Sequence, residues 1–272
     1  MSRFSLTFSN NLNNVFYKNL HQPKPNTYFN KNMNYYICSS GGCGSTILFN
    51  YLSNFGNVYH IHDRYPPNKL QYVGCKNSSE DINSEWFNGI EIPENELINY
   101  KVIFIYRHPI PVIFSRFAQK YGPNTKHLQN IKCDNSGNIN FFDVLRERKD
   151  LYKMEEFFNN YTTISSERNY DIYSIKYELF FNNIDFFNYL MNIPDIKELY
   201  PIKSETSKKY QYINELNLIY KNLILKMNKM AFITRISKIE NREIIETREI
   251  IETREIIETR EIIENKEFNV KV

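Results

Sequence analysis

The sequence predicts an α/β fold in which helices cover both faces of a mostly parallel sheet, giving three layers. Short apolar runs alternate with stretches whose apolar residues recur at three- and four-residue spacing. The run at residues 101–106 is apolar on both faces, as a central parallel strand buried by helices should be. Residues 35–62 read as strand, helix and strand, which is a compact βαβ unit.

The expected elements follow in chain order. Helices are predicted from residue 45, from Pro109, over residues 141–161 as one long helix, and along the apolar seam from Ile213 to Met230. Pro111 is compatible with the second helix because a first turn tolerates proline. Strands are predicted at residues 35–38, 57–62, 71–75, 101–106 and 170–176.

Composition and charge limit the possible domain organisation and the possible partners. A chain of 272 residues with 42% hydrophobic residues can bury a core. We expect an irregular N-terminal arm at residues 1–30, a folded domain at 31–232 and a repetitive charged tail at 233–272. A net charge of +3 is too small to indicate a nucleic-acid partner.

Cysteine usage and hydropathy bear on location. The four cysteines show no CxxC spacing and the N-terminus does not resemble a signal peptide, so we expect a reduced, cytoplasmic protein. Arg107, Arg116 and two prolines interrupt the longest apolar stretch, at residues 102–117. The sequence therefore predicts a soluble protein without a membrane span.

The C-terminal tail repeats Arg-Glu-Ile-Ile-Glu-Thr over residues 242–264. A six-residue repeat rotates its Ile-Ile pair by about 240° each time, so a straight helix gains no continuous apolar stripe. A heptad coiled coil is disfavoured. A solvated helix without activity and a partner-binding tail both remain open.

The first chemical motif is a glycine turn between a strand and a helix. Its glycines allow successive backbone amides to converge on a phosphate, and the helix N-terminus adds partial positive charge. The hydroxyls of Ser45 and Thr46 can donate to the same phosphate. The lysine of a Walker motif is lacking, which argues against ATP or GTP. An ordinary tight turn is the alternative. The candidate ligand-binding residues are Gly41, Gly42, Cys43, Gly44, Ser45 and Thr46.

The second motif is Tyr106-Arg107-His108-Pro109 with Ser115 in the following helix. It resembles the 3′-phosphate motif of sulfotransferases, and the glycine turn resembles their 5′-phosphosulfate loop, with residues 43–46 matching its last four positions. Tyr177-Glu178 resembles a downstream segment of that family. The resemblance covers roughly residues 33–230.

The resemblance implies a P-loop-NTPase-like topology and a reaction that uses 3′-phosphoadenosine 5′-phosphosulfate (PAPS) and no metal. A sulfuryl group would move to an acceptor hydroxyl, with a carbohydrate expected as acceptor. The glycine turn would bind the 5′-phosphosulfate, and Arg107 and Ser115 would bind the 3′-phosphate. A planar guanidinium suits that task because it can grip two phosphate oxygens.

Two positions depart from the family pattern. Gly42 stands where the family carries a lysine or arginine, and Pro111 replaces a common aspartate. Arg64 and Lys76, each close after a predicted strand, are candidates for a substitute cation. His62, and less favourably His60, are candidates for the general base, with a structural role as the alternative for each.

The departures leave other functions open. The chain could bind the nucleotide without turnover, or act as an interaction protein through its repeat. A nucleoside kinase is a further alternative.

Overall fold

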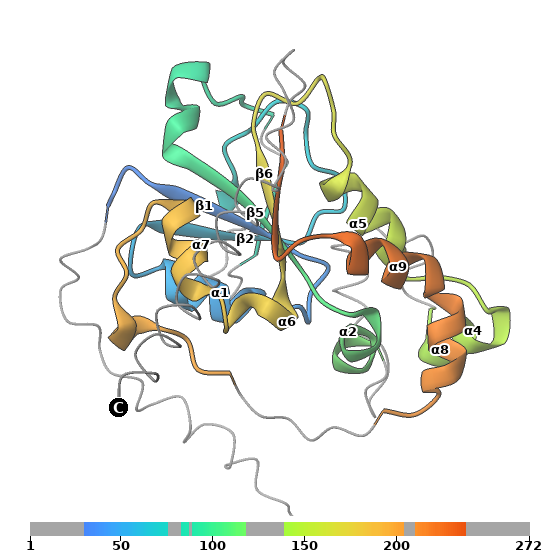
Figure 1. Cartoon of the computed structure of the whole chain (residues 1–272). Coiled ribbons are helices and arrows are strands. Elements are labelled where there is room, and N and C mark those ends of the chain that lie inside the picture. The colour runs from blue at the N-terminus through green and yellow to red at the C-terminus, as the bar shows by residue number, and fades with distance from the viewer. Residues whose placement is uncertain (1–29, 76–82, 87–88, 118–138, 204–209, 238–272) are drawn as a thin grey trace, which may run out of the picture.

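A computed structural model of the chain describes residues 30–75, 83–86, 89–117, 139–203 and 210–237 (Figure 1). In these ranges the strands form one seven-stranded sheet in the order β3-β4-β2-β1-β5-β6-β7. The five strands from β4 to β6 are parallel, whereas β3 and β7 pair antiparallel at the two edges. The predicted α/β class with a mostly parallel sheet is confirmed. The strands are β1 Asn34–Cys38, β2 Asn57–Ile61, β3 Gly74–Cys75, β4 Asn83–Glu85, β5 Tyr100–Tyr106, β6 Ile172–Lys176 and β7 Ile233–Ile236.

The helices of the described ranges are short. None of them is long and apolar enough to cross a bilayer. Two 3₁₀ segments, Glu94–Asn99 and Lys197–Leu199, accompany them. The α-helices are α1 Ser45–Leu52, α2 Pro109–Arg116, α4 Phe141–Glu147, α5 Met154–Thr162, α6 Tyr177–Phe180, α7 Ile184–Met191, α8 Ile213–Ile219 and α9 Lys221–Lys229.

One face of the sheet packs on α5. The ring of Phe104 on β5 stacks on Tyr161 and Phe157 of α5, with centroids 4.8 and 5.9 Å apart. Because strand side chains alternate, Ile103 and Ile105 point to the opposite face, where both are fully buried. This two-sided burial explains the continuous apolar run of β5.

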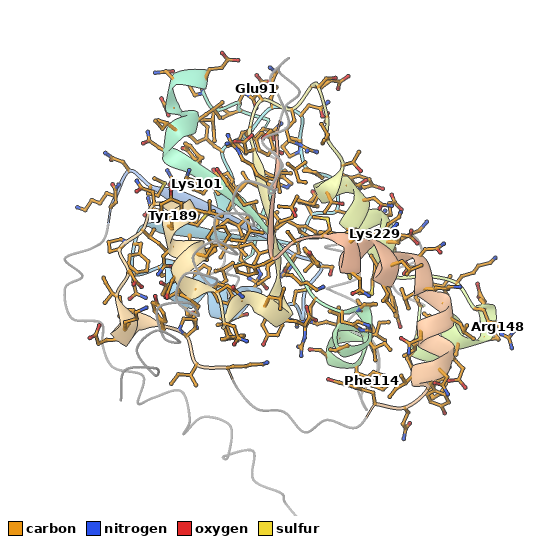
Figure 2. All side chains as sticks on the ribbon, viewed as in Figure 1. Glu91, Lys101, Phe114, Arg148, Tyr189 and Lys229 are labelled. Atoms are coloured by element: carbon orange, nitrogen blue, oxygen red, sulfur yellow. The ribbon has the colours of Figure 1, made fainter. Side chains whose placement is uncertain are left out.

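The opposite face packs on α1 and α7. Tyr51 of α1 donates a buried hydrogen bond of 2.7 Å to the side-chain oxygen of Asn188 on α7, which joins the two helices. Figure 1 shows α1 and α7 away from α5. Tyr189 of α7 and Lys229 of α9, labelled in Figure 2, are exposed. Helices therefore cover both faces of the sheet.

The prediction of one long helix over residues 141–161 is wrong. Arg148 and Lys153 adopt left-handed φ values of 53° and 55°, which end α4 and precede α5. The carboxylate of Asp150 accepts a 2.8 Å hydrogen bond from the Glu155 amide and caps the new helix. The apolar period continued across the break because both helices bury residues in the same core.

The C-terminal elements also differ from expectation. The expected helix from Ile213 to Met230 is divided at Tyr220 into α8 and α9. The sheet continues beyond residue 232, because β7 pairs with β6. The strand expected at residues 71–75 is reduced to β3, with Gln71 forming an isolated bridge to Glu91.

The single tryptophan belongs to the hydrophobic core. Trp86 is 8% exposed and packs edge-on against Tyr36, with centroids 5.5 Å apart. Its indole N–H donates to the Tyr161 hydroxyl at 3.3 Å, and that hydroxyl donates to the Asp63 carbonyl at 2.7 Å. A buried polar chain thus connects β4, α5 and the segment after β2.

Candidate anion site at the carboxyl edge of the sheet

The chain reverses its direction of progress across the sheet between β1 and β5. From β1 it continues through α1 to β2 on one side, and β5 leads to β6 on the other. The segments that follow β1 and β5 leave on opposite faces, and such switch points are where open α/β sheets bind ligands. The glycine turn and the Arg107 motif occupy these two positions.

The glycine turn passes through three left-handed residues before α1 begins. Gly41, Gly42 and Gly44 have φ values of 81°, 67° and 87°, all in the left-handed region that favours glycine. Gly44 is the N-cap of α1 and provides no side chain to cap it. The first amides of α1 therefore face no competing cap from that residue, and the positive end of the helix lies at the turn.

Tight contacts hold the two motifs together. A Cβ built on Gly42 would lie 3.3 Å from Cγ of Arg116 and 3.4 Å from Oγ of Ser115, both on α2. A Cβ on Gly44 would lie 2.2 Å from the ring of Tyr177. The guanidinium carbon of Arg107 lies over that same ring, 4.6 Å from its centroid. The two turns therefore lie side by side, with Tyr177 between Gly44 and Arg107.

The segment after β6 completes this edge. Glu178 accepts a 2.8 Å hydrogen bond from the His108 amide, which connects the start of α6 to the turn before α2. Its second carboxylate oxygen is buried without a hydrogen-bond partner in the described part of the chain. All three segments that carried the family resemblance thus meet at the ends of β1, β5 and β6.

The inner side of the glycine turn is packed and uncharged. Burial raises the pKa of the Cys43 thiol to about 11, and the thiol contacts the Gly41 carbonyl at 3.3 Å. Ser39 accepts a 3.3 Å hydrogen bond from the Gly41 amide. Cys43 therefore stabilises the turn as a neutral thiol. Of the two hydroxyl residues that begin α1, Ser45 is buried and Thr46 is exposed.

The two histidines lie together beneath the turn. Both are 6% exposed, and their ring centroids are 4.3 Å apart. Nδ1 of His62 lies 2.7 Å from the Ser39 carbonyl. Burial lowers the pKa of His62 to about 4, opposed by the Ser39 hydrogen bond and reinforced by the charge of Arg116. His62 is therefore neutral at pH 7, and its packing supports the turn.

Of the two candidates for a substitute cation, the structure describes Arg64 but not Lys76. The Arg64 side chain is 4% exposed; its Nε lies 3.6 Å from the Glu156 carboxylate, and it donates a 2.8 Å hydrogen bond to Tyr65. Its charge is therefore partly balanced by α5. Lys76 lies outside the described residues, as does the hexapeptide repeat.

Sequence reasoning missed Arg116 as a member of this site. It counted this arginine only as a charge interrupting an apolar stretch. The available signal was its position directly after Ser115, at the end of a helix that begins in the second motif.

Hollows elsewhere on the surface do not include these residues. One of about 650 Å³ lies between α5, α9 and β7, and another of about 560 Å³ lies near Tyr65 and the end of α5. Within the described ranges, no cluster of three or more histidine, cysteine, aspartate or glutamate side chains could hold a metal.

Comparison with known proteins identified no relative of this chain. No family model matches this sequence, and neither curated proteins nor solved structures gave a match.

Proposed function

We propose that this chain is a PAPS-dependent sulfotransferase whose nucleotide binds at the carboxyl edge of β1, β5 and β6. One observation carries the proposal: the glycine turn and the arginine motif, far apart in sequence, are held against each other by the contacts of Gly42 with α2 and by Tyr177. A ligand with two phosphate groups would meet one motif at each end. We regard the turn between β1 and α1 as P-loop-like.

Each end of the nucleotide has a chemically suited group. The amides of the glycine turn and the N-terminus of α1 would receive the 5′-phosphosulfate. Arg107 would grip the 3′-phosphate through its planar fork, with the Ser115 hydroxyl donating to the same group. The ring of Tyr177 holds the guanidinium in place by a cation–π contact, so part of its ordering is completed before the ligand arrives.

The proposed reaction is an in-line transfer. The acceptor hydroxyl oxygen forms a bond to sulfur while the bond from sulfur to the 5′-phosphate oxygen breaks, and the bonding electron pair stays on that oxygen. The acceptor proton passes to a base. Hydrogen-bond donors and a cation near the departing phosphate stabilise the charge that develops there. A carbohydrate hydroxyl remains the proposed acceptor class.

A second candidate function is nucleotide binding without turnover. Two observations favour it: Gly42 contributes no cation, and His62 is buried with a pKa of about 4, which makes it a weak base at neutral pH. Tight binding of adenosine 3′,5′-bisphosphate with no sulfuryl transfer to a panel of acceptors would favour this function over catalysis.

The first test is binding of adenosine 3′,5′-bisphosphate, compared with ATP, by calorimetry on the full chain. We expect the bisphosphate to bind more tightly than ATP. Arg107→Ala should lower its affinity about 10- to 100-fold, because a charge-assisted phosphate contact is lost.

The control is Arg235→Ala, which removes an exposed arginine that pairs with Asp171 on the last two strands. It should leave the affinity unchanged. Equal affinities of wild type and Arg107→Ala would remove Arg107 from the site, and a preference for magnesium-ATP would favour a kinase instead.

A further inference from the structure

We infer that Arg116 is the cation of the glycine turn and binds the 5′-phosphate end of the ligand. This inference rests on the proposed function and assigns the charge that Gly42 does not supply. It makes Arg116, rather than Arg64 or Lys76, the group that neutralises the departing phosphate.

The Arg116 side chain lies against the glycine turn. Its Cγ would lie 3.3 Å from a Cβ at Gly42, which is closer than most contacts between two carbon atoms, so the side chain starts out against the turn. A side chain at position 42 would press on it and would also be strained at the φ of 67° found there. A glycine at this position therefore leaves room for a cation that approaches from α2.

The packing of α2 orients Arg116 toward the turn. Phe114, labelled in Figure 2, packs on Phe141 of α4 and on Tyr210, with centroids 5.4 and 5.2 Å apart. Arg116 follows two residues later, which is a rotation of about 200° around the helix. The helix thus fixes Phe114 toward its helical neighbours and Arg116 toward the glycine turn.

The electrostatic environment of the turn includes the charge of Arg116. The positive charge of Arg116 lowers the pKa of His62, so that charge acts on the residue hydrogen-bonded to Ser39 at the start of the turn. Nε of Arg116 is buried and has no hydrogen-bond partner among the described residues. A buried guanidinium N–H without an acceptor is costly, and a bound phosphate oxygen would satisfy it.

The neighbouring charges favour an anion with more than one negative charge. Arg107 also lies near the turn, because its charge lowers the pKa of the Cys43 thiol, whereas that of Glu178 raises it. Glu178 is a carboxylate and opposes anion binding, but it is engaged by the His108 amide. Two arginines and one carboxylate therefore lie near the turn, and the arginines are in excess.

A purely structural role for Arg116 is the competing explanation. It lies in the last turn of α2, where a basic residue interacts favourably with the helix dipole. That role predicts a change in stability without any change in selectivity between ligands. The test must therefore compare two ligands that differ only in the 5′-phosphate.

The experiment measures binding of adenosine 3′,5′-bisphosphate and of adenosine 3′-monophosphate to the full chain. Arg116→Gln should weaken the bisphosphate about 10- to 100-fold and the monophosphate less than about 3-fold, because only the first ligand reaches the turn. Arg116→Lys should recover part of the lost affinity, since it keeps the charge but not the planar fork. Arg148→Gln, at the outer end of α4 in Figure 2, is the charge-matched control and should change neither affinity.

The outcomes separate the inference from the proposed function. Equal weakening of both ligands, or no weakening of either, would overturn the role of Arg116 while leaving the nucleotide site intact. Failure of the wild-type chain to bind the bisphosphate would overturn the proposed function and the inference with it. If Arg116→Gln unfolds, Arg116→Lys decides alone: a ligand ratio identical to wild type would overturn the inference.

Discussion

Gly44 shows how one missing methyl group determines the geometry of the site. Its φ of 87° favours glycine, and a Cβ added there would lie only 2.2 Å from the nearest ring atom of Tyr177. The same ring supports Arg107. A residue that defines the start of α1 therefore also fixes the aromatic platform on which the second motif rests.

Gly44→Ala should destabilise the fold by more than about 3 kcal/mol, since it combines left-handed strain of about 1 kcal/mol with a clash against a buried ring. Chemical denaturation measures the change. The matched control is Gly89→Ala, where φ is 65° but no atom lies within 4 Å of the added Cβ, so only the strain applies. Equal losses for the two variants would show that the Tyr177 contact is unimportant.

At the scale of elements, helix ends are set by single left-handed residues. α4 begins with a capping box in which Asn140 and Asp143 satisfy each other's amides, and it ends at Arg148 with a φ of 53°. Arginine is not favoured in that conformation, whereas glycine is the usual residue there. The break between α4 and α5 therefore persists because the two helices pack separately on the core.

Arg148→Gly should stabilise the chain by about 0.5–1 kcal/mol, because glycine removes the left-handed strain. Arg146→Gly, two residues earlier and inside α4, should instead destabilise it by up to about 1 kcal/mol. Thermal unfolding of the two variants measures the opposite signs. A loss of stability in both would contradict this account of the helix end.

The same break shows what the sequence could and could not predict. The strands β1, β2 and β5 were predictable because their apolar runs end at glycine, polar or charged residues. The helix break was not, since Arg148 and Lys153 carry no turn signal and the apolar period runs on. The meeting of the two motifs followed from parallel-strand topology. The position of Arg116 directly after Ser115 placed it near the second motif, but its contact with Gly42 depends on how α2 packs and could not be predicted from spacing.

At the scale of the whole molecule, the sheet is finished by antiparallel strands on both edges. β7 buries Ile233 and Ile236 and covers the free side of β6, whose carboxyl end leads directly to Tyr177. An uncovered β6 would expose a row of unpaired backbone groups. We therefore expect β7 to unfold together with the rest of the sheet.

Ile236→Ala should lower the free energy of unfolding by about 2 kcal/mol or more, as expected for truncating a buried isoleucine. Arg235→Ala, next to it and exposed, loses only an ion pair with Asp171 and should change stability by less than about 1 kcal/mol. Denaturant titration should give one transition for each variant. Two separate transitions would show that β7 folds independently of the sheet.

The placement of Trp86 gives the molecule a built-in optical probe. As the one indole in the chain, joined through Tyr161 to the carbonyl of Asp63, it is coupled to the segment next to His62. Its fluorescence will therefore follow both global unfolding and rearrangements of the polypeptide behind the glycine turn. Ligand titrations can be followed without attaching a dye.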